Sequence, residues 1–160
     1  MNGKDYIKML EDSLVKKVEL LQVIQGLNQE QRDILEDYTT TPQELDDNIE
    51  KKSEIIDRLD KMDEGFQSIY DKVKDDLANN KEEYADSIKH MQELITRITD
   101  ISADVQAKEM QNKQLAQSRF AHVRSQIKET KHSQKAVASY YANMMNTTGY
   151  EDSQFWDQKK

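Results

Sequence analysis

Residues 39–44 read TTTPQE, and they carry the strongest local signal for how this chain folds. Thr41 is suited to cap a helix, and Pro42 suits the first helical position because its missing N–H would have no helical partner there. Glu44 follows Thr41 by three residues and completes a capping box, in which each side chain accepts a hydrogen bond from the backbone of the other residue. The stretch therefore predicts that one helix ends before it and that a second helix begins at residue 42.

Apolar residues recur at helical spacing on both sides of this break. Before it, steps of three and four separate seven apolar residues, which places them on one helix face: Ile7, Leu10, Leu14, Val18, Leu21, Ile24 and Leu27. After it, the apolar residues from Leu45 to Leu77 have a spacing near 3.5, which favours left-handed packing against neighbouring helices. Lys52 and Asp63 interrupt this second seam, so it is not a regular zipper.

A second break follows at Asn79 and Asn80, because Asn tolerates the left-handed backbone conformation in which helices end. A third and longer helical pattern then begins. We expect helices over about residues 4–38, 42–78 and 81–135, together forming one helical domain over residues 1–135. Short connections between long helices favour antiparallel neighbours, so the predicted fold is all-α, an elongated antiparallel three-helix bundle.

The third pattern is longer than the other two by nearly twenty residues, so a straight third helix would overhang its partners by roughly 25 Å. Basic residues from Lys113 to Lys135 occupy the overhanging part. A bend near Asn112, with the remainder folding back as a fourth helix, is the alternative. Residues 136–160 form a C-terminal tail rich in aromatic residues and Met, and Gly149 with its acidic neighbours indicates that this tail is partly irregular.

Composition restricts the class of protein. In 160 residues, 36% hydrophobic and 34% charged residues allow one narrow core, and one Pro with four Gly favours long helices. No stretch is apolar for eighteen residues, and the N-terminus lacks the apolar run of a signal peptide. We therefore expect a soluble cytoplasmic protein without membrane insertion. The absence of Cys excludes disulfides and thiolate metal sites.

Charge is distributed unevenly along the chain, whose formal net charge is -8. Residues 1–110 carry 15 basic and 27 acidic side chains, whereas residues 111–160 carry 8 basic and 4 acidic ones. The acidic majority argues against nonspecific nucleic-acid binding. The basic residues recur at helical steps, so we interpret them as a solvated or partner-facing helix surface.

Motifs for catalysis or metal binding are missing or incomplete. The chain has no Gly-rich phosphate loop, no Cys nucleophile and no nucleophile elbow. Glu129 and His132 form one ExxH pair, but a di-iron bundle requires two such pairs and two further carboxylates. The acidic side chains Asp57, Asp60 and Asp63 have a step of three, which is not the spacing of a calcium loop. We predict no enzymatic activity, no metal site and no cofactor.

The C-terminal tail allows two interpretations. In one, its first aromatic and Met residues cap the bundle as core while residues 150–160 are disordered. In the other, they form a partner-binding element, because Tyr and Trp are favoured interface anchors and Met packs adaptably. Together with apolar residues late in the third helix, the predicted partner-binding residues are Leu115, Phe120, Val123, Ile127, Tyr140, Tyr141, Met144, Met145, Phe155 and Trp156.

Three segments carry a resemblance to a known family: MNGKDYIKMLEDSLVKKVELLQVIQGLNQEQRDIL at the start, LDDNIEKKSEIIDRLDKMDEGFQSIYDKV in the middle, and the ending YY followed by QFWDQKK. In these the chain resembles the FlgN-type flagellar export chaperones, which are cytoplasmic helical proteins of the flagellar type III secretion system. The resemblance implies that the chain binds hook-associated (hook-filament junction) proteins through their terminal amphipathic helices. It also implies delivery of these clients to an export-gate component, with Tyr140 or Tyr141 contributing to docking.

A client helix would bury its apolar stripe against exposed residues of the third helix, for which Phe120, Val123 and Ile127 are the candidates. The alternative function is that of a generic coiled-coil adaptor or scaffold without a role in secretion.

Overall fold

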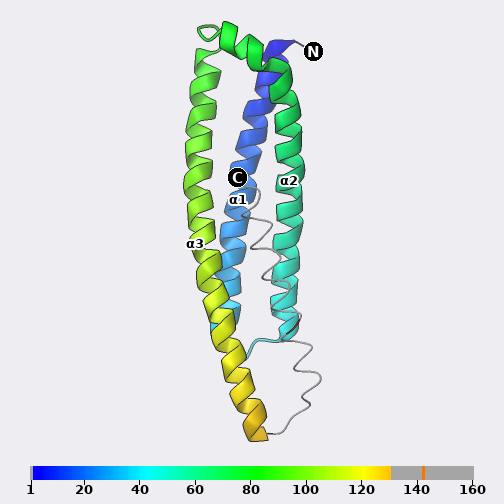
Figure 1. Ribbon diagram of the computed structural model, residues 1–160, viewed down its shortest axis with the longest axis vertical. Coiled ribbons are helices and arrows are strands. Elements are labelled where there is room, and N and C mark those ends of the chain that lie inside the picture. The colour runs from blue at the N-terminus through cyan, green and yellow to red at the C-terminus, as the bar shows by residue number, and fades with distance from the viewer. Residues whose placement is uncertain (1, 131–141, 143–160) are drawn as a thin grey trace. The chain divides into compact units, whose positions relative to one another are not determined.

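A computed structural model of the protein describes residues 2–130 and 142, and three helices account for most of them (Figure 1). The helices are α1 over Gly3–Glu36, α2 over Pro42–Asn79 and α3 over Ala85–Thr130. The prediction of an all-α three-helix bundle is confirmed, and the described residues contain no strand. Helix α3 continues through Asn112 without a break, so the described part of the chain does not bend there into a fourth helix. The predicted tail lies outside the described residues except for Ala142.

The turn between α1 and α2 follows the capping prediction closely. The backbone N–H of Glu44 donates to Thr41 Oγ1 at 3.3 Å, and the backbone N–H of Thr41 donates to Glu44 Oε2 at 2.6 Å. The predicted capping box and the start of α2 at Pro42 are therefore confirmed. Helix α1 ends at Glu36, two residues earlier than expected, because Asp37 turns the chain. Its Oδ1 accepts from both the hydroxyl and the backbone N–H of Thr39, and these hydrogen bonds lower the pKa of Asp37.

The turn between α2 and α3 begins at the predicted asparagines but is longer than expected. Helix α2 ends at Asn79, and the side-chain amide of Asn80 donates to the Asp76 carbonyl oxygen at 3.0 Å, which satisfies a terminal carbonyl of the helix. The Tyr84 hydroxyl donates to Asp76 Oδ2 at 3.0 Å. Residues 81–84 are consequently held as turns, and α3 begins at Ala85, four residues after the predicted start.

The chain divides into two compact units, each built from parts of all three helices. Unit 1 comprises Met1–Val23 and Asp57–Asp104. In this unit α1 runs antiparallel to α2, since Gly3 lies beside Asp76 while Lys17 pairs with Asp63 at 2.8 Å. It runs parallel to α3, since Gly3 lies beside Tyr84 just before α3 while Glu11 contacts His90 at 2.8 Å (Figure 1). Asp63, which interrupts the apolar seam of α2, thus meets a basic partner. The core of unit 1 contains Ile7, Leu10, Leu14, Val18, Val73, Tyr84, Met91 and Leu94.

Unit 2 comprises Ile24–Ile56 and Val105–Lys160, of which residues 131–141 and 143–160 are outside the described part. Its core includes Ile34, Leu35, Leu45, Ile49, Ala116 and Phe120. Arg119 of α3 closes this core against the α1–α2 turn. The guanidinium donates through Nη1 to the carbonyl oxygen of Ile34 and to Thr40 Oγ1, both at 2.6 Å, and through Nη2 to the carbonyl oxygen of Thr40 at 2.8 Å. The bond to Ile34 satisfies a carbonyl that the end of α1 leaves without a helical partner, and the bonds to Thr40 fix the turn that follows.

A buried ion pair lies inside unit 2. Lys52 Nζ is 2.5 Å from Glu109 Oε1, and the two side chains are 1% and 6% exposed. The ammonium also donates to Gln31 Oε1 at 3.3 Å, and the amide of Asn112 donates to the same oxygen at 3.0 Å. The second interruption of the α2 seam is therefore a polar contact that involves all three helices of the unit. Burying a charge is costly unless the charge is paired, so this pairing requires one register of the helices.

Removing the cap of α2 tests the first turn. We expect Thr41→Ala to lower the free energy of unfolding by about 1 kcal/mol, because the backbone N–H of Glu44 loses its side-chain acceptor. Urea denaturation followed by circular dichroism measures this change. Thr41→Ser keeps the hydroxyl and serves as the control, with a midpoint close to that of the wild type. An unchanged midpoint for Thr41→Ala would contradict the assigned cap.

Breaking the buried ion pair tests its structural role. We expect Lys52→Met alone or Glu109→Leu alone to cost about 3–5 kcal/mol of unfolding free energy, because each leaves an unpaired charge in the core. The double variant should recover most of the loss. Lys8→Met is the matched control, since Lys8 and Asp12 form an exposed pair worth below about 0.5 kcal/mol. Single variants as mild as this control, or a double variant with additive losses, would show that the pair does not act as described.

Candidate functional site

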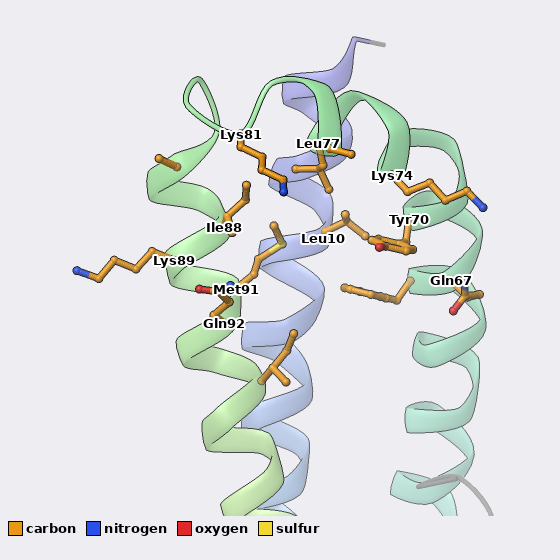
Figure 2. A pocket seen from close by; sticks show the side chains of 14 residues that line it. Leu10, Gln67, Tyr70, Lys74, Leu77, Lys81, Ile88, Lys89, Met91 and Gln92 are labelled. Atoms are coloured by element: carbon orange, nitrogen blue, oxygen red, sulfur yellow. The ribbon is translucent and has the colours of Figure 1, made fainter.

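An apolar groove of about 820 Å³ lies in unit 1, between α2 and α3 and above α1. Leu10 of α1, Tyr70 of α2 and Met91 of α3 point into the space between the helices (Figure 2). Phe66 and Ile95 also line it. The groove thus receives large apolar side chains from all three helices, which is the surface chemistry that a partner's apolar face requires.

The spacing of the lining residues explains why they share one groove. On α2, Phe66 and Tyr70 are four residues apart, and on α3, Ile88 and Ile95 are seven apart, so each pair lies on one helix face. The rings of Phe66 and Tyr70 stack with their centroids 6.3 Å apart. Tyr70 is 41% exposed and Ile95 is 49% exposed, although both belong to apolar helix patterns. Exposed aromatic and aliphatic side chains gathered in a concave surface are typical of an interface.

The residues that line the groove and carry a charge at neutral pH are all basic. Lys74 comes from α2, Lys81 from the α2–α3 turn and Lys89 from α3, and neither Asp nor Glu lines the groove. Lys81 reaches over the groove, whereas Lys74 and Lys89 extend outward at opposite edges (Figure 2). The apolar floor therefore has a positively charged rim.

Sequence reasoning did not identify this groove. Phe66 and Tyr70 belong to the apolar pattern between Leu45 and Leu77, which predicts packing against neighbouring helices. Periodicity gives the face on which a residue lies but not how completely a third helix covers that face. One signal was present in the sequence. Phe66 and Tyr70 are the only aromatic residues of α2, and they stand one helical turn apart in a seam that otherwise contains aliphatic residues.

The predicted partner-binding residues of α3 lie in unit 2. Phe120 was expected to be exposed, but this expectation is wrong, since its side chain is 3% exposed and packs in the core of that unit. Leu115 is half-buried against the same core, and Val123 and Ile127 are half-buried. The remaining predicted residues lie outside the described part of the chain: Tyr140, Tyr141, Met144, Met145, Phe155 and Trp156. Partner binding by this set remains a prediction.

Comparison with known proteins gives a family match. The family model described as FlgN protein matches residues 1–147. The chain belongs to the FlgN family. No curated protein and no solved structure matches it. FlgN membership assigns the chain the general role of a flagellar export chaperone. The match includes Tyr140 and Tyr141 but ends before Phe155 and Trp156, so the aromatic ending lies beyond the part that the family model covers.

The two histidines that the structure of this FlgN-family chain describes, His90 and His122, have local partners. His90 Nδ1 is 2.8 Å from Glu11 Oε2. Burial raises the pKa of Glu11, but its hydrogen bonds with Ser87 and His90 outweigh this effect, and the net shift is downward. His122 lies with its ring centroid 4.3 Å from that of Tyr38. Within residues 2–130 and 142 no three His, Cys, Asp or Glu residues gather as a metal site would require, and His132 of the ExxH pair lies outside them.

The described helices of this FlgN-family chain, α1, α2 and α3, were compared with the length of apolar sequence that a bilayer requires. Among the described residues, none of the three is apolar enough over eighteen residues to cross a membrane.

Proposed function

We propose that this chain binds the terminal amphipathic helices of hook-filament junction proteins in the cytoplasm, keeps them from aggregating, and delivers them to the flagellar export gate. Family membership supports the general chaperone role. The observation that carries the finer proposal is the exposed apolar groove of unit 1. An amphipathic helix binds a protein by laying its apolar face in such a groove, with anchors at helical spacing.

The dimensions of the groove fit a short helix. Its lining on α3 extends over residues 85–95, which corresponds to about 15 Å at the rise of an α-helix. A client segment of about three turns covers this length. Such a segment is apolar on one face and aggregates when exposed, so covering that face is what a chaperone must do.

The C-terminal part of the chain has a separate part in the proposal. We infer that Tyr140, Tyr141, Met144, Met145, Phe155 and Trp156, together with Leu115, Val123 and Ile127, form a second contact surface for the client or the gate. Tyr and Trp anchor interfaces, and adjacent Met residues adapt to different partners, which supports this assignment. Tyr140 or Tyr141 is the proposed contact to the gate.

Polar substitutions in the groove test the client site. We expect Tyr70→Ser with Ile95→Ser to weaken binding of the purified junction protein by at least about tenfold, because both exposed anchors are lost. Isothermal titration calorimetry measures the affinity, and urea denaturation should show a stability close to that of the wild type. Met110→Ser is the matched control, since Met110 is 54% exposed but does not line the groove. Full affinity in the double variant would place the client elsewhere.

Deleting residues 136–160 tests the role of the C-terminal part. We expect the deletion to abolish client binding or delivery while the helical circular dichroism signal stays nearly intact, because it removes no residue of α1, α2 or α3 as the structure describes them. Client affinity and export of the junction protein into the culture medium are the two measurements. Unchanged binding together with unchanged export would remove these residues from the proposal.

A further inference from the structure

The charged side chains that line the groove are positive, although the chain as a whole is negative. The whole sequence has 31 acidic and 23 basic residues, yet the charged groups lining the groove are Lys74, Lys81 and Lys89. Lys81 reaches over the groove, and Lys74 and Lys89 extend outward from its two edges, so the three ammonium groups place positive charge at the rim (Figure 2). A docked helix would meet this charge with the residues beside its apolar stripe.

The three lysines are available to a partner to different degrees. Lys74 Nζ is 3.9 Å from Asp71 Oδ1, a loose pair between half-exposed side chains. Lys81 and Lys89 form no ion pair with any residue of the described part of the chain. Lys81 lies over one end of the groove, and Lys89 stands at the α3 edge (Figure 2). Positive charge therefore borders the groove at one end and along both sides.

We propose that the groove selects an amphipathic helix of about three turns whose apolar stripe is flanked on both sides by Asp or Glu. This inference rests on the proposed function and specifies the chemistry of the client segment. The apolar floor takes the stripe, and the rim lysines pair with the flanking carboxylates. Exposed ion pairs are individually weak, so three of them give a selectivity of about tenfold between acidic and basic flanks.

The net charge of the whole chain predicts the opposite preference, for basic flanks. A chain of net charge -8 attracts basic peptides and repels acidic ones at long range. A preference for acidic flanks therefore requires the local field of the groove.

The test uses the full chain and three labelled peptides of about 14 residues that share one stripe of Leu and carry Glu, Gln or Lys beside it. Fluorescence anisotropy measures each affinity at about 50 mM and about 500 mM NaCl. We expect the Glu peptide to bind about tenfold more tightly than the Lys peptide, with the Gln peptide between them and the differences shrinking at high salt. Equal affinities, tighter binding of the Lys peptide, or no binding of any peptide would overturn the proposal.

Charge reversal assigns the preference to the groove. The triple variant Lys74→Glu, Lys81→Glu and Lys89→Glu should reverse the order of the peptides. The control exchanges Lys16, Lys51 and Lys61 for Glu, which changes the net charge equally at exposed positions outside the groove, and it should keep the wild-type order. Exchanging the three rim lysines for Gln, a milder change, should abolish the preference. An unchanged order in both rim variants would overturn the assignment.

The double variant Tyr70→Ser and Ile95→Ser separates this inference from the proposed function. If that variant loses client binding but the wild type shows no preference among the peptides, the proposed function holds and the charge selectivity is overturned. Retained client binding would overturn both. A dimer in analytical ultracentrifugation that this variant dissociates would assign the groove to a second copy of the chain, which would also overturn the proposal.

Discussion

The buried contact of Lys52 with Glu109 constrains unit 2 more strictly than any apolar contact does. Hydrophobic packing is non-directional and tolerates a shift of one helix along another, whereas a shift by one turn would leave two charges buried without partners. Gln31 and Asn112 extend the constraint to α1 and α3. Every buried polar or charged residue of the described chain lies in unit 2: Asn28, Gln31, Asn48, Lys52, Glu109, Asn112 and Arg119. The helix register is set there.

Unit 1, which contains the groove, has none of these buried polar or charged residues in its described part. Its buried core is apolar, and it includes Met91, a flexible side chain that also lines the groove. Its ion pairs between helices, such as Lys17 with Asp63, are partly exposed, so breaking them costs less than breaking the buried pair of Lys52 with Glu109. The molecule thus combines one unit whose buried polar contacts specify the arrangement of its helices with one unit whose groove is the proposed site for a client helix. For a chaperone, this separates the stability of the fold from the accommodation of clients.

The parts of the fold that were predictable from sequence depend on local signals. Two examples are the capping box at Thr41 and Glu44 and the break at Asn80. Their hydrogen bonds join residues three or four apart, so the local sequence is enough to predict them. Lys52 was recognisable as an interruption of a seam, but its partner lies on another helix and follows only from packing. The same limit explains the error at Phe120 and the missed groove. Periodicity assigns a residue to a face, and only the third helix decides how far that face is covered.

Arg119 donates to Ile34 at the end of α1 and to Thr40 in the turn before α2, although it is synthesised long after both residues. Thr40, which accepts from its guanidinium, precedes it by 79 residues. The hairpin of α1 and α2 can therefore form early in synthesis. The carbonyl groups at its turn gain the Arg119 guanidinium as a donor only after α3 has been synthesised as far as this residue. Such long-range closure slows folding, because the intervening chain must be ordered first. Most of the chain must therefore be translated before this turn is sealed, and a truncated product would leave it open.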